Sequence, residues 1–532
     1  MAEVTLTING QKITAGDKDT ILVAAARNGI YIPSLCFMKD CNRAAACRIC
    51  VVEVARIIIK KKICVTLVRE GMDVQTENER IKKARRITLD MICRNHRMIC
   101  DRCDRYSDCE LHALCVRYGV NERDYNPYVM DPDKDKSSPY LIRDTSKCVL
   151  CQRCVSACHA QGMDVISVLG RGREKRIAPP IPLAQTDCVG CGQCVRACPT
   201  GALTICDDTA TIRNLIRQKK KTAIAVLMPS VGQSIGQLFY EKEKQDQTGK
   251  VVAMLRKLGF TRVYSGESCQ REFQAAEAKE LERRKQENGV LPMISQACPG
   301  LEHLIHSQYP SLEEHLSGIG TLQSFSAQLA RAAYEKEMGE SELQVVCINS
   351  CTAAKGESEE YMNLTTYELA AMFRRACVSR FTARKVWEEQ LKPEPFDPLP
   401  MEEGLNSFSP DTDKVDDAAM EVPPRSARRQ DDSPMEVRCA KGESVEVTGL
   451  ANIKPVLEKI AAGMEAPPAS ICPALDGAQD NQRQDDPLMK VCSAKDESVE
   501  PGEMFIGYVC PGGCINGGGA PRLTSAATLL EE

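Results

Sequence analysis

Cys148-Val149-Leu150-Cys151-Gln152-Arg153-Cys154-Val155-Ser156-Ala157-Cys158 recurs further along the chain as Cys188-Val189-Gly190-Cys191-Gly192-Gln193-Cys194-Val195-Arg196-Ala197-Cys198-Pro199. Each run has the spacing C-x2-C-x2-C-x3-C, and in paired runs of this kind the fourth cysteine binds the cluster of the other run. The sequence therefore predicts two [4Fe–4S] clusters. One is expected on Cys148, Cys151, Cys154 and Cys198, and the other on Cys188, Cys191, Cys194 and Cys158.

The region around these runs, residues 140–210, is interpreted as a two-cluster ferredoxin domain of the bacterial type. Before it, residues 79–139 contain one histidine and three cysteines at H-x3-C-x2-C-x5-C spacing. These are His96, Cys100, Cys103 and Cys109. Taken alone they fit a Cys3His zinc site as well as a cluster. Directly after a ferredoxin-like domain, the spacing resembles the His-ligated [4Fe–4S] module of [FeFe]-hydrogenases and of the large iron–sulfur subunit of respiratory complex I.

Residues 1–78 hold another four-cysteine set, Cys36, Cys47, Cys50 and Cys64. Four thiolates that include one C-x2-C pair suit a [2Fe–2S] cluster, although the first gap is longer than in the plant-type pattern. Alternating strands and a short helix around residues 20–26 predict a β-grasp, ferredoxin-like domain. A structural zinc site is the alternative.

After residue 221 the composition changes to that of an α/β domain. Continuous apolar runs at 222–227 and 345–348 predict buried parallel strands, and 250–258 and 322–338 have helical periodicity. This region also contains the glycine-rich stretch 509–521, in which glycine lets the backbone pass close to a bulky inorganic ligand. Four cysteines stand at the ends of strands or in turns here: Cys298, Cys351, Cys510 and Cys514.

Bulk composition narrows the function classes. The chain has 532 residues, 29 of them Cys, and a net charge of −4, which argues against a nucleic-acid partner. No apolar run is long enough to span a bilayer, and no signal peptide is visible. Metal-bound thiols in a reducing, cytoplasmic compartment are therefore expected.

The peptides around Cys298, Cys351 and Cys510–Cys514 resemble the three signature motifs of [FeFe]-hydrogenases, and the flanking text at 229–231, 258–260, 291–293 and 364–370 agrees. The first 139 residues are similar to the same family and to the large iron–sulfur subunit of respiratory complex I. The resemblance implies that the four cysteines hold the [4Fe–4S] part of an H-cluster, with Cys514 bridging to a two-iron subsite. It further implies that Pro229, Ser230 and Lys355 contact the cofactor, and that Glu277, Glu280 and Ser317 form the outer part of a proton route.

The chain departs from the family pattern at several positions. Ala297 replaces the family's proton-passing cysteine, Ala354 replaces a lysine that donates to a cyanide, with Lys355 displaced by one, and Asn349-Ser350 replaces Met-Pro. Glu277 and Glu280 also fit an exposed, charged helix that has no part in proton transfer. Residues about 395–500 lack the family's glycine-rich stretch and instead form an acidic segment in which 429–446 is repeated at 483–500. Such a composition favours a solvated, partly disordered insertion. Within it, residues 445–448 and 452–460 still resemble the family's strand and helix.

The resulting expectation is a multidomain α+β and α/β protein with a shortened hydrogenase-like domain at 221–532. It would carry one [2Fe–2S], three accessory [4Fe–4S] clusters and an H-cluster for reversible H2 oxidation. The alternatives are an electron-transfer or H2-sensing subunit with little turnover, and a non-catalytic scaffold of a complex I-like assembly. No G-x-G-x-x-G follows a strand, so a separate NAD(P)-binding flavoprotein subunit and a small [2Fe–2S] subunit are the expected partners, with ferredoxin as an alternative.

Overall fold

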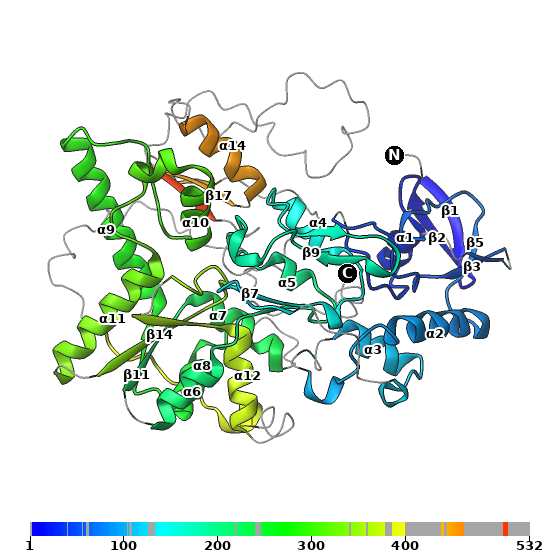
Figure 1. Ribbon diagram of the computed structural model, residues 1–532, viewed down its shortest axis with the longest axis horizontal. Helices are drawn as coiled ribbons and strands as arrows, with labels where there is room; N and C mark the ends of the chain where they lie inside the picture. Colours follow the sequence, from blue (N-terminus) through cyan, green and yellow to red (C-terminus); the bar gives the residue numbers. More distant parts are fainter. Residues whose placement is uncertain are drawn as a thin grey trace.

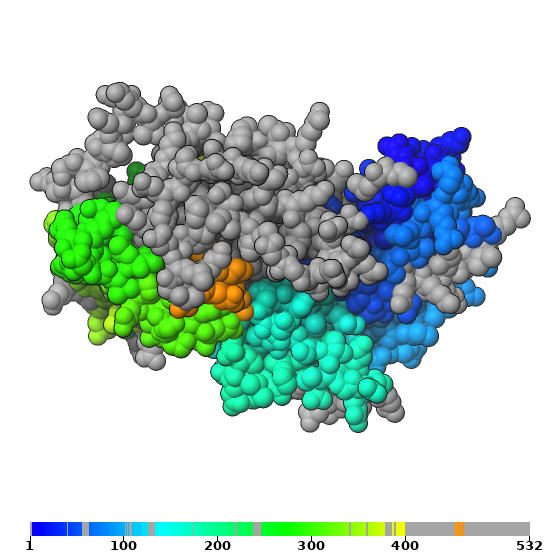
Figure 2. All heavy atoms as spheres, turned by 90° about the horizontal axis from the view of Figure 1, so that it is seen from above, coloured from blue at the N-terminus to red at the C-terminus, as the bar shows by residue number. Residues whose placement is uncertain are grey.

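The computed structural model of the chain describes residues 3–39, 41–55, 57–59, 63–103, 105, 109–125, 134–218, 221–239, 246–339, 342–357, 360–377, 386–399, 438–440, 444–448, 450–461 and 504–508. In Figure 1 the N-terminal sheet and the helices α2 and α3 lie together at one end of the long axis, the cysteine-run region lies in the middle and most of the C-terminal region lies at the other end. The space-filling view from above shows the cysteine-run region between the N-terminal and C-terminal regions (Figure 2). The expected mixture of sheets and helices is confirmed.

The N-terminal region is a five-stranded sheet in the order β2-β1-β5-β3-β4. Strands β1 and β2 form an antiparallel hairpin, and β5 pairs with β1 in parallel. Helix α1 (Ile21–Arg27) begins at Thr20, whose side chain accepts a hydrogen bond from the Val23 N–H. The strands are β1 (Glu3–Ile8), β2 (Gln11–Gly16), β3 (Val52–Val54), β4 (Ile57–Ile59) and β5 (Asp73–Gln75).

Two helices connect this sheet to the cysteine runs. Helix α2 (Glu79–Cys93) begins at Asn78, whose side chain accepts a hydrogen bond from the Ile81 N–H, and α3 (Glu110–Arg117) begins at Cys109. The buried residues of α2 recur every four positions, so one stripe of the helix faces the core. That stripe is Ile81, Arg85, Leu89 and Cys93.

The cysteine-run region combines a three-stranded sheet, β10-β7-β6, with two short helices and a hairpin. The two runs repeat their backbone geometry: Leu150 and Gln152 have φ of 55° and 64°, and Gly190 and Gly192 both have φ of 67°. The second run places glycine where positive φ is free of strain, whereas the first run forces two larger residues into it. The elements are β6 (Lys134–Asp135), β7 (Leu141–Asp144), α4 (Arg153–Ala160), β8 (Ser167–Leu169), β9 (Arg176–Ala178), α5 (Gln193–Ala197) and β10 (Leu203–Ile205).

The C-terminal region contains a parallel sheet in the order β12-β11-β14-β15. Alternate residues of β11 and β14 enter two different hydrophobic clusters, so both faces of the sheet are covered. The strands are β11 (Thr222–Leu227), β12 (Arg262–Ser265), β14 (Leu343–Asn349) and β15 (Tyr361–Thr365). The surrounding helices are α6 (Thr209–Gln218), α7 (Pro229–Ser234), α8 (Thr248–Leu258), α9 (Gly266–Gln286), α11 (Leu322–Met338) and α12 (Thr366–Ala376).

A second sheet in this region has the order β13-β18-β17-β16 and packs with two helices. Part of the acidic segment contributes to it: β16 and β17 form a hairpin within the first copy of the repeat, and α14 follows. The remainder of that segment lies outside the described residues. The elements are β13 (Met293–Ile294), α10 (Pro299–Gln308), β16 (Arg438–Ala440), β17 (Ser444–Thr448), α14 (Leu450–Ala461) and β18 (Met504–Tyr508).

Arg85 joins the N-terminal sheet to α2 and α3. It is fully buried, and its guanidinium donates five hydrogen bonds. Among the side chains, only arginine presents five N–H donors in one fixed planar group. The acceptors are the carbonyls of Ile49 (3.2 Å), Val51 (2.8 Å) and Thr76 (2.9 Å), the carboxylate of Glu77 (2.7 Å) and the hydroxyl of Tyr118 (2.8 Å).

We predict that Arg85→Leu destabilises the N-terminal region by about 3–5 kcal/mol, because it leaves buried acceptors unpaired. Hydrogen–deuterium exchange measured by mass spectrometry should show loss of protection across residues 49–77. The exposed neighbour provides the control, since Arg86→Leu should change protection little. Equal protection in both variants would contradict the structural role of Arg85.

Candidate functional site

The two cysteine runs surround two cavities. Cys148, Cys151, Cys154 and Cys198 line the first, and Cys158, Cys188, Cys191 and Cys194 line the second. The fourth cysteine of each run thus faces the cavity of the other run, which is the grouping expected from the spacing. The remaining lining is largely apolar, including Ile166, which borders both cavities.

These thiols need a cation beside them in order to ionise. Burial raises the pKa of Cys151 and of Cys191 to about 12, so neither thiol ionises at neutral pH without a cation beside it. Backbone N–H groups point at the sulfurs, for example the Leu150 N–H at 3.4 Å from the Cys148 sulfur. Four thiols around a largely apolar cavity, with a backbone N–H donor beside them, are the chemistry that a [4Fe–4S] cluster requires, so the residues present fit such a cluster.

The N-terminal thiols Cys36, Cys47, Cys50 and Cys64 are also buried and lie close together. Hydrogen bonds from Cys47 and Cys64 lower the pKa of Cys36, and Cys64 contacts Cys50 as well. The Leu35 N–H donates to the Cys47 sulfur at 3.3 Å. A group of four cysteine thiols fits a [2Fe–2S] cluster, and a zinc ion is the alternative.

His96 has the properties of a metal ligand. It is 5% exposed, and burial lowers its pKa to about 4, so the imidazole is neutral at physiological pH. Its Nδ1 atom is buried without a hydrogen-bond partner, which leaves a lone pair or proton unused. Cys100 and Cys109 lie in one hydrophobic cluster close by, and Cys103 is half-buried. Cys115 instead lies 3.5 Å from the sulfur of Cys93, in keeping with a structural role.

In the C-terminal region, Cys298 directly precedes α10 and Cys351 follows the carboxyl end of β14. Both are buried. Cys510, Cys514 and the glycine-rich stretch lie outside the described residues. Strand β18 ends at Tyr508 and runs parallel to β13, whose carboxyl end leads to Cys298. Strand β18 therefore finishes, at Tyr508, at the same end of the sheet as the strand that leads to Cys298.

Residues around the second cavity contact the surroundings of both of these cysteines. Cys298 packs in one hydrophobic cluster with Val189, and Cys191 lies against that cluster. The hydroxyl of Thr352 donates a hydrogen bond to the carbonyl of Gly190. A side chain at Gly190 would come within 3.0 Å of the Ala353 backbone, so only glycine permits this approach.

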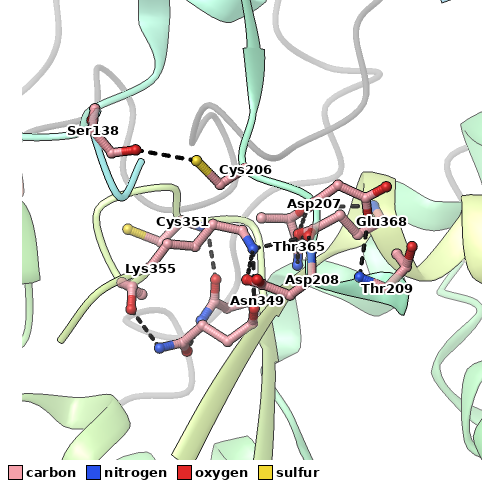
Figure 3. A network of polar contacts seen from close by, with 12 residues as sticks. Ser138, Cys206, Asp207, Asp208, Thr209, Asn349, Cys351, Lys355, Thr365 and Glu368 are labelled. Carbon is pink, nitrogen blue, oxygen red and sulfur yellow. Dashed lines mark hydrogen bonds and ion pairs between the residues drawn. The ribbon is translucent and has the colours of Figure 1, made fainter. Parts of the chain in front are cut away.

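Lys355, predicted to contact the cofactor, is buried and bound to two carboxylates (Figure 3). Its ammonium lies 2.9 Å from Glu368 and 2.5 Å from Asp208, and the Asp208 N–H also donates to Glu368 at 2.9 Å. Glu368 belongs to α12, where it completes a capping box with Thr365, and Asp208 follows β10. The ion pairs therefore join the cysteine-run region to the parallel sheet, and the cofactor contact of Lys355 stays a prediction.

The residues that replace the family's Met-Pro hold the loop of Cys351. The side-chain oxygen of Asn349 accepts a hydrogen bond from the Cys351 N–H at 2.9 Å (Figure 3), and the Ser350 hydroxyl lies 3.0 Å from that of Thr366. Pro229 and Ser230 follow the carboxyl end of β11, the strand beside β14, so they stand at the same sheet edge as Cys351.

The expected proton-route residues have contrasting surroundings. Glu277 is buried, which excludes the exposed-helix alternative for it, and burial raises its pKa. The Ser295 hydroxyl donates to Glu277 at 2.9 Å and accepts from the Ala297 N–H at 3.2 Å. Ser317 is buried and lies close enough to lower the pKa of Glu277 in part. Sequence reasoning missed Ser295, because a lone serine after a strand carries no distinctive pattern.

Glu280 is bound by two arginines on its own helix. Its carboxylate lies 2.9 Å from Arg283 and 3.0 Å from Arg284, and the hydrogen bond with Arg283 lowers its pKa. Arg284 also donates to the carbonyl of Leu316 at 2.5 Å, next to Ser317. Glu280 is thus held near Ser317 as a carboxylate, and Arg284 is a second residue that the sequence did not single out.

Four family models match the chain. The model of the iron only hydrogenase large subunit, C-terminal domain, matches residues 221–518. The others are a 2Fe-2S iron-sulfur cluster binding domain at residues 1–79, the NADH-ubiquinone oxidoreductase-G iron-sulfur binding region at 85–124 and a 4Fe-4S dicluster domain at 142–202. No helix in the described part of the chain is long and apolar enough to cross a membrane.

Two relatives match nearly the whole chain. The NADP-reducing hydrogenase subunit HndD of Solidesulfovibrio fructosivorans is 30% identical, and the match covers 100% of this chain and 91% of the relative. Iron hydrogenase 1 of Clostridium pasteurianum is 28% identical over 98% of this chain and 89% of its own length. A solved [FeFe]-hydrogenase from Chlamydomonas reinhardtii is 16% identical with a TM-score of 0.38, covering 61% of this chain and 88% of that chain.

Replacing Lys355, whose ammonium lies between the carboxylates of Asp208 and Glu368, should weaken the contact between the cysteine-run region and the parallel sheet. We predict that Lys355→Met costs about 3–5 kcal/mol, because Glu368 is buried and loses its counterion. Burial already raises the pKa of Glu368, and without Lys355 the carboxyl takes up a proton more readily. A carboxyl whose pKa is raised in the folded state stabilises the fold at low pH, and this contribution is lost as the pH rises. The loss of stability caused by Lys355→Met should therefore be smaller at pH 5 than at pH 8.

Anaerobic thermal unfolding at both pH values measures this deficit, and Lys355→Met combined with Glu368→Gln should recover part of it. A deficit that is equal at the two pH values would show that Glu368 is not the group left unpaired.

Proposed function

The chain belongs to the iron-only hydrogenase large-subunit family, and from that membership we propose that it passes electrons along a row of iron–sulfur clusters to an H-cluster for reversible H2 oxidation. In this proposal residues 1–78 form a β-grasp [2Fe–2S] domain and 79–139 a His-ligated [4Fe–4S] module. Residues 140–210 form the two-cluster domain and 221–532 a shortened H-cluster domain with the acidic insertion at about 395–500. The thiol groups and cavities described above support one [2Fe–2S] and three accessory [4Fe–4S] clusters.

One observation supports the proposal most strongly. The loop between Cys188 and Cys191 touches the loop of Cys351 through Gly190 and Thr352, and Cys191 lies against the hydrophobic cluster that contains Cys298. The residues around the last accessory cavity therefore pack against the surroundings of Cys298 and Cys351, which supports electron transfer between the two proposed clusters. Cys298 and Cys351 supply two of the four proposed ligands, and Cys510 and Cys514 would supply the others.

When bound, the H-cluster supplies the iron centre at which two protons and two electrons are exchanged with H2. This chain's own residues determine how protons reach it. Glu277 is a buried carboxyl that can hold a proton, and the Ser295 hydroxyl connects it to the backbone of Ala297. Ser317 and Glu280 continue the route outward, where Arg283 and Arg284 keep Glu280 ionised. Ala297 has no side-chain group that can carry a proton, so the proposed route lacks its innermost member.

The proposed partners follow from the same relatives. A relative that matches the whole chain is named as a subunit of an NADP-reducing hydrogenase, and this chain has no dinucleotide-binding fingerprint of its own. We therefore propose an NAD(P)-binding flavoprotein subunit and a small [2Fe–2S] subunit as partners, with ferredoxin as the alternative donor or acceptor. A reducing, cytoplasmic location suits the many thiols.

A second function is favoured by Ala297 and Ala354. A subunit that transfers electrons or senses H2 needs the clusters but not rapid proton delivery. Positioned proton transfer typically contributes about 10²–10⁴-fold to a rate, so the missing donor allows H-cluster binding with very slow turnover.

The proposal predicts a defined iron load. One [2Fe–2S] and four [4Fe–4S] units amount to about 18 iron atoms per chain before any two-iron subsite. Iron analysis of anaerobically reconstituted protein measures the load. Infrared bands of metal-bound carbonyl and cyanide after maturation would reveal the two-iron subsite. Less than about half of the iron, or stoichiometric zinc, would exclude the cluster assignment.

Ala297→Cys should restore the inner end of the proton route. We predict that it raises hydrogen turnover by at least about tenfold, a modest share of the range for positioned proton transfer. Ala297→Ser is the matched control and should do less, because a hydroxyl is a far weaker acid than a thiol. Iron content and infrared bands should be the same in all three proteins. If the subsite is bound normally and turnover does not rise, then proton delivery at position 297 is not the limiting defect.

A further inference from the structure

Asn42 lies between two of the thiol groups. It belongs to the loop that carries Cys36 and Cys47, and it is 2% exposed. Its side-chain nitrogen donates one hydrogen bond to the carbonyl of Cys36 at 2.8 Å and another to the carbonyl of Cys151 at 3.0 Å. Cys36 belongs to the N-terminal thiol group and Cys151 to the first cavity. One amide therefore connects the backbones of two proposed ligands from different cluster sites.

The orientation of this amide is fixed. The side-chain oxygen of Asn42 accepts from the Ala44 N–H at 3.1 Å and from the Ser156 hydroxyl at 3.2 Å. Both N–H donors and both lone pairs are thus used, and exchanging the nitrogen and oxygen would set an oxygen against two carbonyls. The backbone of Asn42 exchanges two hydrogen bonds of 3.0 Å with Met38, which holds the residue in place.

The surroundings are dry. Cys36, Cys47 and Cys151 belong to one hydrophobic cluster, so apolar atoms pack around the contact. Beside it the buried ion pair of Arg153 and Glu110, 2.8 Å apart, joins α4 to α3. Electron tunnelling through a protein weakens less across covalent and hydrogen bonds than across gaps between packed atoms. The two hydrogen bonds of Asn42 provide a bonded connection from one ligand residue to the other.

We propose that Asn42 is the bridge for electron transfer between the [2Fe–2S] site of Cys36 and the [4Fe–4S] site of Cys151. One electron leaves the reduced [2Fe–2S] cluster and enters the oxidised [4Fe–4S] cluster, or moves in reverse, with no proton or bond change. Asn42 acts as a positioning residue, because it holds the two ligand loops together and connects them by hydrogen bonds. The inference rests on the proposed cluster assignment.

Pulse radiolysis of the anaerobically reconstituted full chain tests the proposal. A substoichiometric dose of electrons is followed by redistribution between clusters, which appears as a first-order phase independent of protein concentration. We expect Asn42→Ala to slow this phase about tenfold or more, the order of effect that loss of a fixed geometry produces. Ser156→Ala is the matched control, since it removes one bond to the Asn42 oxygen and leaves both carbonyl contacts, and it should change the rate less than twofold.

Iron content and the EPR signals of both clusters must be measured in every variant. If the wild-type protein lacks these signals, the cluster assignment fails. If Asn42→Ala carries both clusters and redistributes electrons at the wild-type rate, the bridge is refuted while the assignment stands. Asn42→Ser, which keeps a small polar group but cannot reach both carbonyls, serves if Asn42→Ala does not assemble. If neither variant assembles its clusters, Asn42 is structural and the bridge is again refuted.

Discussion

A buried cysteine thiol does not ionise readily, because burial disfavours the charged thiolate. The rest of the structure depends on this constraint. Burial raises the pKa of Cys148 to about 11 and that of Cys151 to about 12, so each cavity favours protons until cations replace them. Iron offers that replacement, and its binding energy then becomes folding energy for the short helices and loops around it. This explains how strands of only two to four residues, such as β6 and β7, and five-residue helices such as α5 can form a region of the fold.

Polar contacts between ligand loops set the order of the proposed clusters. Asn42 joins the N-terminal thiols to the first cavity, Arg153 and Glu110 join that cavity to the helix that begins at Cys109, and Thr352 joins the second cavity to the loop of Cys351. Each contact lies beside a proposed cluster ligand and not on a distant part of the protein surface. The chain therefore fixes the distances between neighbouring cluster sites with the same loops that bind them, which ties electron transfer directly to packing.

The sequence was most informative for motifs in which metal binding or burial requires a regular spacing of residues. The crossing of Cys198 and Cys158 between cavities follows from the repeat alone, and the strands at 222–227 and 343–349 follow from continuous apolar runs. Sequence was less informative where tertiary contacts decide. Lys355 was expected at the cofactor, yet its ammonium is bound by Asp208 and Glu368, which are distant in sequence. In the acidic segment, composition favoured disorder, but the family resemblance predicted the strand at 445–448, where β17 pairs with β16 and β18.

The departures from the family pattern lie in the C-terminal region and not among the residues proposed to bind the accessory clusters. Every residue proposed as an accessory ligand is present in the sequence, and the polar contacts between the groups are buried and paired. Ala297 alone interrupts a proton route whose neighbours are still present: Glu277 remains buried, Ser295 still bonds to it, and Arg283 and Arg284 still hold Glu280. A buried carboxyl with a raised pKa is costly to retain unless a proton is useful there. The buried carboxyl of Glu277 is therefore a site that can hold a proton, and two hydrogen bonds through Ser295 connect it to Ala297, the position at which the proposed route is interrupted.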